Sequence, residues 1–307
     1  MNVSVVVPVF NGDKSLRELV SRLSPVLHAL CENYEVILVN DGSEDGSWET
    51  ITQLAAEHTW VHGIDLMRNY GQHNAVLCGI RAAEHEVVVT LDDDLQHPPE
   101  EIPKLVQKLA EGYDVVYGIP ERKQHGIWRN FASLVTRWTM RSTLGPKVPN
   151  DFSAFRALRT ETREAFRQYN SPFVSVELLL TWASTRFASI KVRHEARQFG
   201  ASTYTLRKLL VYVPFLITGY SALPLRLASL AGFTFTIFGL FVLVYVLGRY
   251  FILGGSLPGF PFLASTIAIF SGVQLFALGV IGEYLAQMHF RTMDRPIYTI
   301  HTTTTRS

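Results

Sequence analysis

The sequence predicts an α/β fold in which one domain, built on a mostly parallel, doubly wound sheet, is followed by two transmembrane helices. Three observations lead to this fold class. Short apolar runs alternate with helical patterns up to about Tyr204. Polar clusters follow directly on those runs, as they do at the carboxyl ends of parallel strands. Beyond Tyr204 charge nearly vanishes, with none between Arg226 and Arg249 and none between Arg249 and Glu283.

The elements of the domain, residues 1–204, follow from periodicity. Apolar runs rich in β-branched residues predict strands at residues 3–7, 35–39, 61–67, 86–91 and 114–117. Helical patterns lie between them, at residues 15–30, 48–58, 72–83 and 99–111. In the first helix, six apolar residues from Leu16 to Leu27 share one face. This alternation favours crossover connections, and hence a sheet whose ligands bind beyond the carboxyl ends of its strands.

Two apolar stretches near the C-terminus predict a transmembrane hairpin over residues 223–290. A spanning helix needs roughly 20 apolar residues, and residues 227–248 and 262–282 both reach that length. Basic residues flank the outer ends of the pair, whereas only Arg249 lies in the connecting loop; the flanking residues are Arg226, Arg291, Arg295 and Arg306. The positive-inside rule therefore places the N-terminal domain and the tail of residues 291–307 in the cytoplasm.

The segment of residues 205–222 precedes this hairpin. It combines Arg207 and Lys208 with aromatic and aliphatic residues, which predicts a helix lying along the membrane surface. The alternative is an ordinary helix packed on the N-terminal domain.

The composition and the missing motifs argue against several classes of protein. A formal net charge of +1 disfavours a nucleic-acid binder, because such proteins usually carry a basic excess. Cys31 and Cys78 lie far apart in apolar segments, which predicts reduced, buried thiols. The N-terminus lacks the features of a secretory signal. Neither G-x-G-x-x-G after the first strand nor a P-loop motif occurs, which disfavours a nicotinamide-binding domain and a P-loop enzyme.

Polar clusters end the first four predicted strands and are expected to converge on one crevice. They read "PVFNGD", "VNDGSEDGS", "MRNYGQH" and "LDDDLQ". Helix capping and turn formation are the alternative, and they suit Ser43, Asp45 and Gly46 better than Asp41, which is nearest its strand end. Three adjacent aspartates at the end of a buried strand repel one another, so a cation is expected beside them. Magnesium binds carboxylate oxygens together with substrate phosphates, which makes a metal-held phosphate the favoured interpretation.

Five segments in this order resemble one family. They are "VVVPVFN", "VNDGSEDGS", "RNYGQHNA", "LDDDLQHPPEEIPKLV" and "GYDVVYG", ahead of the two apolar helices. The chain resembles the family 2 polyprenyl-phosphate glycosyltransferases, a group with a GT-A catalytic domain that includes dolichyl-phosphate mannose synthase. Through "NYGQH" and "LQHPPEEIP" it is most similar to the bacterial undecaprenyl-phosphate 4-deoxy-4-formamido-L-arabinose transferase type. The resemblance spans nearly the whole chain.

The resemblance implies a donor site at the ends of the first four strands. Asp92 and Asp94 match the D-x-D motif, so Asp94 and Gln96 would bind Mg²⁺ or Mn²⁺ and Asp92 would contact the nucleotide ribose or the metal. Asp93 stands between them where alanine is common, grouped with the nucleotide-contacting residues but expected to turn away by strand alternation. The residues matched to the nucleotide base are Pro8, Phe10, Val39 and Asp41, with Arg68 matched to base or phosphate.

On the acceptor side, the resemblance matches Asp151 to an aspartate beside the acceptor and Arg156 to the arginine that follows it. Asp151 would orient the acceptor phosphate or act as a base, unless it is only a helix cap. Arg122, with its neighbour Lys123, fits a basic loop over the phosphates. Two residues depart from the family pattern: Gly12 replaces a glutamate, and Thr203 replaces a phosphate-binding lysine.

The implied activity is inverting, metal-dependent transfer of one sugar from a nucleotide sugar, with uracil the preferred base, to undecaprenyl phosphate. The expected location is the cytoplasmic face of a bacterial inner membrane, in envelope glycan or lipid modification. Two alternatives stay open. A processive polysaccharide synthase shares the fold, and "LVTRW" at 134–138 resembles its Q-x-x-R-W signature except at Leu134. The other is a membrane-anchored nucleotide-sugar binder without catalysis. Whether the chain forms a homo-oligomer is open too.

Overall fold

The computed structural model describes residues 1–121, 152–171, 174–195, 223–253, 259–293 and 295–304. The chain forms two compact units. The first, called the sheet unit here, comprises Met1–Thr203 and Asp294–Ser307, and the second, the hairpin unit, comprises Tyr204–Met293. The predicted surface helix at 205–222 lies outside the described residues, as do Arg122, Asp151 and Thr203.

The sheet unit is built on an eight-stranded sheet in the order β7-β5-β6-β4-β1-β2-β3-β8. Its centre is parallel, as predicted, and consists of β1 (Val3–Val9), β2 (Tyr34–Asn40), β3 (Val61–Leu66) and β4 (Val87–Thr90). The fifth predicted strand is β5 (Val115–Pro120). The sheet as a whole is mixed, because β6 (Arg156–Arg159) inserts antiparallel between β4 and β5. On the far side of β5, β7 (Phe187–Val192) pairs in parallel.

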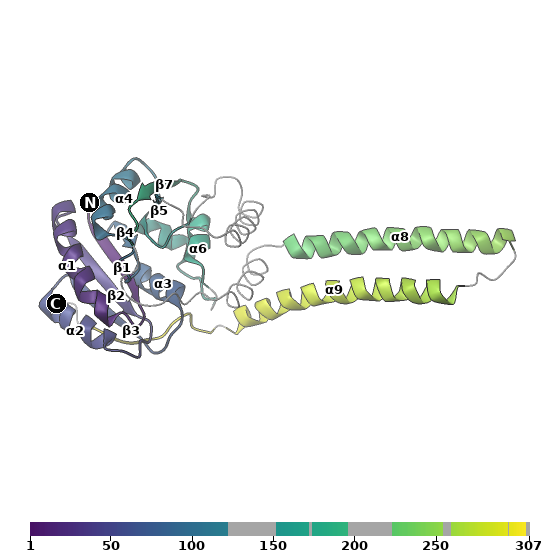
Figure 1. Ribbon diagram of the computed structural model, residues 1–307, viewed down its shortest axis with the longest axis horizontal. Helices are drawn as coiled ribbons and strands as arrows, with labels where there is room; N and C mark the ends of the chain where they lie inside the picture. Colours follow the sequence, from purple (N-terminus) through teal and green to yellow (C-terminus); the bar gives the residue numbers. More distant parts are fainter. Residues whose placement is uncertain (122–151, 172–173, 196–222, 254–258, 294, 305–307) are drawn as a thin grey trace. The chain divides into compact units, whose positions relative to one another are not determined.

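Helices cover both faces of this sheet (Figure 1). One face carries α1 (Asp13–Leu30), α2 (Ser47–Glu57) and α4 (Ile102–Ala110), with the short turn η1 (Pro99–Glu101) ahead of α4. The other carries α3 (Gln72–Ala82), α6 (Val176–Ala183) and the turn η2 (Thr160–Phe166). The four predicted helices are confirmed, with ends that differ by up to three residues; the largest difference is at the start of α4, where Pro99–Glu101 form η1.

The strand β1 lies in the middle of the sheet and shows why these residues form a doubly covered strand. Its alternate valines pack into the two cores: Val5 and Val7 face α1 and α2, and Val6 faces α3. On the α3 side, a Cβ atom at Gly79 would lie 2.2 Å from the Val6 side chain. A glycine there lets α3 approach the sheet closely.

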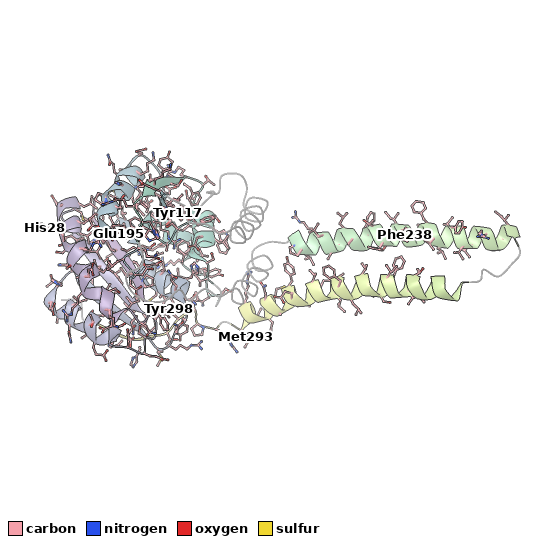
Figure 2. All side chains as sticks on the ribbon, viewed as in Figure 1. His28, Tyr117, Glu195, Phe238, Met293 and Tyr298 are labelled. Carbon is pink, nitrogen blue, oxygen red and sulfur yellow. The ribbon has the colours of Figure 1, made fainter. Side chains whose placement is uncertain are left out.

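The C-terminal residues return to the sheet unit. The strand β8 (Ile300–Thr303) pairs antiparallel with β3 at the edge of the sheet, and Ile297 is buried in the core beneath α3. Tyr298 lies partly buried beside Cys78 and Arg81, and Figure 2 labels it. From the sequence, residues 291–307 were expected to be a tail, and no strand was predicted in them.

The hairpin unit consists of two long helices, α8 (Leu223–Leu253) and α9 (Phe260–Thr292). Within them, Pro224–Arg249 and Ile269–His289 are long and apolar enough to cross a membrane. Large apolar side chains cover both helices and stay exposed, Phe238 on α8 among them at 58 % (Figure 2). A surface of this kind is stable in lipid rather than in water. The sequence therefore contains two candidate transmembrane helices, as predicted.

Candidate active site

The polar clusters at the ends of β1 and β2 are in direct contact. The backbone N–H of Asn11 donates to Ser43 Oγ at 3.0 Å, and the N–H of Gly12 donates to Ser47 Oγ at the same distance. In return, Asn11 Oδ1 accepts from the Glu44 N–H at 2.9 Å. Ser43 and Ser47 therefore brace the first loop, a structural role close to the turn chemistry expected for the second cluster.

The second and third clusters meet at Asp41. Its two carboxylate oxygens accept hydrogen bonds from the backbone N–H groups of Tyr70 and Gly71, at 2.7 and 2.9 Å. Burial raises the pKa of Asp41, and these two bonds partly offset that effect by stabilising the charged form. Asp41 was matched to base binding, and in the structure it joins the end of β2 to the start of α3.

The fourth cluster joins the others through Asp92. Gln72 Nε2, in the first turn of α3, donates to Asp92 Oδ1 at 2.5 Å. Asp94 accepts from the backbone N–H of Gln96 at 3.1 Å, which closes the turn after the aspartates. All four clusters are thus linked, as the strand-end argument predicted.

Asp93 points toward the first loop. Its Oδ2 atom is buried with no hydrogen-bond partner among the described residues. Burial, reinforced by the neighbouring Asp92 and Asp94, raises the pKa of Asp93 to about 7, although the N–H of Phe10 favours its charged form. The carboxyl group is close enough to Gly12 that a Cβ atom there would lie 2.2 Å from Oδ2.

The residues matched to the nucleotide base differ in exposure. Phe10 is 45 % exposed, and Arg68 is exposed with its guanidinium 4.7 Å above the ring of Tyr70. Pro8 and Val39 are buried in the sheet. In the described part of the chain, Phe10 and Arg68 are therefore the members of this set that offer an open surface to a ligand.

The donor set at Asp92, Asp94 and Gln96 fits a hard divalent cation. It offers carboxylate and amide oxygens, which Mg²⁺ and Mn²⁺ accept. Within the described residues there is no group of three or more His, Cys, Asp or Glu side chains that could hold a metal. An ion bound by one or two carboxylates, with substrate phosphates as its remaining ligands, does not need such a group.

His97, next to this set, is held by packing. Its ring stacks on Phe155 at 5.3 Å and meets His194 edge-on at 5.1 Å. Burial, together with His194, lowers the pKa of His97 to about 4. The ring is therefore neutral at physiological pH.

Arg156 lies in a buried network that pattern reasoning missed. Its Nη1 contacts Glu177 Oε1 at 3.1 Å, and its Nε donates to Thr90 Oγ1 at 3.1 Å, at the end of β4. Glu177 also accepts from Ser175 Oγ and lies 3.5 Å from His73 Nδ1. Arg156 was matched to the arginine that follows the acceptor-side aspartate and was grouped with the cofactor-binding residues, and the structure engages its guanidinium with protein groups. Burial would raise the pKa of Glu177, but His73 and Arg156 outweigh it and lower that pKa to about 2.

The segment Tyr70–His73 connects these groups. Its successive residues contact Asp41, Asp92 and Glu177, which come from β2, the end of β4 and α6. From the sequence, this segment was expected to be one of the converging strand-end clusters and part of the family resemblance. The structure shows that this segment contacts three acidic side chains, those of Asp41, Asp92 and Glu177.

A second polar chain runs from β2 to the C-terminal strand. Asn40 Nδ2 donates to Asp65 Oδ1 at 2.7 Å, and His301 Nδ1 lies 3.0 Å from Asp65 Oδ2. The loop after β2 is joined to it, because the Ser43 N–H contacts Asn40 Oδ1 at 3.4 Å. Residues beyond the hairpin unit thus touch the framework of the site.

The mixed sheet with helices on both faces has the architecture of the GT-A fold. The fold is similar to that of glucosyl-3-phosphoglycerate synthase from Mycobacterium tuberculosis in complex with Mn²⁺, UDP and glucosyl-3-phosphoglycerate, with a TM-score of 0.52 and 20 % identity. That match covers 71 % of this chain and 77 % of that one. A complex of the same enzyme with Mn²⁺, UDP-glucose and phosphoglyceric acid gives a TM-score of 0.51.

The model of glycosyl transferase family 2 matches residues 4–167. Curated relatives named undecaprenyl-phosphate 4-deoxy-4-formamido-L-arabinose transferase match almost the entire chain. The Aeromonas hydrophila protein is 37 % identical over 97 % of this chain and 93 % of its own length. The Pseudomonas aeruginosa protein is 36 % identical over 97 % of this chain and 89 % of its own. The chain belongs to glycosyl transferase family 2.

Proposed function

We propose that this enzyme transfers one sugar from a nucleoside-diphosphate sugar, with uracil the preferred base, to undecaprenyl phosphate. The observation that carries the proposal is the extent of the similarity. Relatives named for this acceptor match 97 % of the chain, which contains both candidate transmembrane helices. A transferase with a lipid acceptor needs a membrane anchor beside a nucleotide-sugar site, and this chain contains elements suited to both.

Asp92, Asp94 and Gln96 are proposed to hold Mg²⁺ or Mn²⁺ against the donor diphosphate. Support comes from their oxygen donor set and from the Mn²⁺ bound by the similar fold of glucosyl-3-phosphoglycerate synthase. When bound, the ion would neutralise the charge that grows on the leaving diphosphate. Gln72 keeps Asp92 oriented, and Phe10 and Arg68 offer an exposed ring and an exposed cation to the nucleotide.

The acceptor phosphate needs little activation by the protein. A phosphate monoester has a second pKa of about 6, so near neutrality it is already mostly a dianion. The transfer is proposed to proceed by direct displacement at the anomeric carbon, with inversion. Asp151 and Arg122, matched to the acceptor and phosphate side, stay proposals because they lie outside the described residues.

The proposed location is the cytoplasmic face of the bacterial inner membrane. Two candidate transmembrane helices support a membrane enzyme, and the arginines at their outer ends favour both termini in the cytoplasm. This orientation gives the sheet unit access to soluble nucleotide sugars.

The test is a transfer assay with the full chain in detergent. The protein is incubated with a panel of radiolabelled nucleotide sugars, a UDP-linked 4-deoxy-4-formamido-L-arabinose among them, and with short-chain undecaprenyl phosphate and Mg²⁺ or Mn²⁺. We expect one labelled lipid product, abolished by chelation and by Asp94→Asn. Glu111→Gln is the matched control, because Glu111 is an exposed carboxylate paired with Lys108. Nucleotide binding without any lipid product would support a non-catalytic binder, and a polymeric product would support a processive synthase.

A further inference from the structure

The loop that follows β1, residues Phe10–Gly12, is held from two sides. On one side the hydroxyl groups of Ser43 and Ser47 accept from its backbone N–H groups. On the other side lies the Asp93 carboxyl, which interacts with the Phe10 N–H. Asn11 has a φ of 54°, in the left-handed region that asparagine adopts more readily than most residues other than glycine.

Gly12 leaves the space that Asp93 fills. A Cβ atom at position 12 would lie 2.2 Å from Asp93 Oδ2, 3.2 Å from its Cγ and 3.3 Å from the Val9 side chain. Non-bonded atoms do not approach to 2.2 Å, so a side chain at position 12 and the present position of the Asp93 carboxyl exclude each other. The oxygen concerned is buried and has no partner among the described residues.

We propose that Gly12 and Asp93 are a matched pair, in which Asp93 is a positioning residue that holds the Phe10–Gly12 loop and thereby sets the donor pocket. Asp93 acts through the loop, because its buried oxygen faces Gly12. The loop presents Phe10, the exposed aromatic ring at the strand ends. The consequence for donor binding rests on the proposed function, whereas the coupling between the two residues does not.

The experiment is a double-mutant cycle on the full chain in detergent, with Gly12→Ala, Asp93→Ala and the double variant. Binding of UDP in the presence of Mn²⁺, donor KM, acceptor KM and kcat are measured for each protein. We expect Gly12→Ala to weaken UDP binding and to raise donor KM by about tenfold when Asp93 is present, a coupling in the range known for contacting residues. In the Asp93→Ala background the same change should have an effect of less than about twofold. Acceptor KM should stay unchanged, which a general loss of structure would not produce.

A second cycle moves the carboxyl group. Gly12→Glu combined with Asp93→Ala transfers the carboxyl group from one residue of the pair to the other, and we expect UDP binding within about threefold of the original protein. Gly12→Glu alone places two carboxyl groups in one space and should be the weakest binder of the set, by about tenfold or more. Equal effects of the position 12 substitutions in both backgrounds would overturn the proposal.

The two proposals fail in different ways. If the original protein transfers sugar and Asp94→Asn does not, the proposed function stands whatever the cycles show. If the original protein neither transfers sugar nor binds UDP, the cycles are read by thermal unfolding of the same four proteins. A melting-temperature loss on Gly12→Ala that disappears in the Asp93→Ala background supports the pair, and an additive loss overturns it.

Discussion

Glu177→Ala is expected to destabilise the sheet unit, because it leaves the buried Arg156 without its counter-charge. The Arg156 side chain is 2 % exposed and contacts Glu177 at 3.1 Å, with Thr90 as its other partner. Removing one partner of a buried ion pair costs about 3 to 5 kcal/mol of unfolding free energy. Because Glu177 itself is 16 % exposed, we expect a loss near the lower end.

The direction in which the pKa of Glu177 is displaced agrees with this loss. His73 and Arg156 lower it from 4.5 to about 2 against the opposing effect of burial. A displacement of that size corresponds to about 3 kcal/mol. Since the folded-state pKa lies below the unfolded value, this stabilisation is fully present above about pH 4.5 and is lost as the pH falls toward 2.

The assay is urea unfolding of the full chain in detergent, followed by tryptophan fluorescence. Glu177→Gln keeps the shape and a hydrogen-bond acceptor, so it separates charge from packing. We expect Glu177→Gln to be less stable than the original protein by about 2 kcal/mol at pH 7, with the gap narrowing between pH 4.5 and 3. A Glu177→Ala protein within about 1 kcal/mol of the original, or a gap that does not change with pH, would refute the reasoning.

Three further predictions follow from close contacts. Gly79→Ala should lower unfolding free energy by about 1 to 3 kcal/mol through overlap with Val6, and retained stability in urea would contradict the close packing of α3. Asp41→Asn should weaken UDP binding by about tenfold, because the amide has only one oxygen to accept from the backbone N–H groups of Tyr70 and Gly71. An unchanged dissociation constant would show that other contacts hold the start of α3. Deleting residues 299–307 removes the pairing with β3, so we expect faster proteolysis of the sheet unit, and an unchanged rate would rule out a supporting role for β8.

The parallel core was predictable because its strands are buried on both faces. Continuous apolar runs such as Val87–Thr90 lie between helices with clear periodicity, and both signals are local. In the described part of the chain, three strands escaped prediction, and none carries such a run: β6 reads Arg-Ala-Leu-Arg, β7 reads Phe-Ala-Ser-Ile-Lys-Val and β8 reads Ile-His-Thr-Thr. Each is a strand because of the neighbour it pairs with, which is a tertiary effect.

The candidate site likewise has one part that the sequence predicts and another part that depends on tertiary contacts. The convergence of the acidic strand ends follows from topology, so the sequence sufficed to predict it. The burial of Arg156 depends on Glu177, 21 residues away on another element, and no spacing rule connects them. Likewise, the glycine at position 12 has a reason only once the Asp93 carboxyl is seen beside it.

The start of α3 organises the site and also limits how the site can hold phosphate. The positive end of a helix dipole favours an anion, and here the Asp41 carboxylate already lies against the residues that begin α3. The side chains of the next two residues, Gln72 and His73, contact Asp92 and Glu177. In the described part of the site, the helix start therefore serves the protein's own carboxylates rather than a substrate phosphate. The charge of a bound diphosphate would then be met by other groups, and the proposed cation beside Asp92 and Asp94 and the exposed guanidinium of Arg68 are the groups available for it.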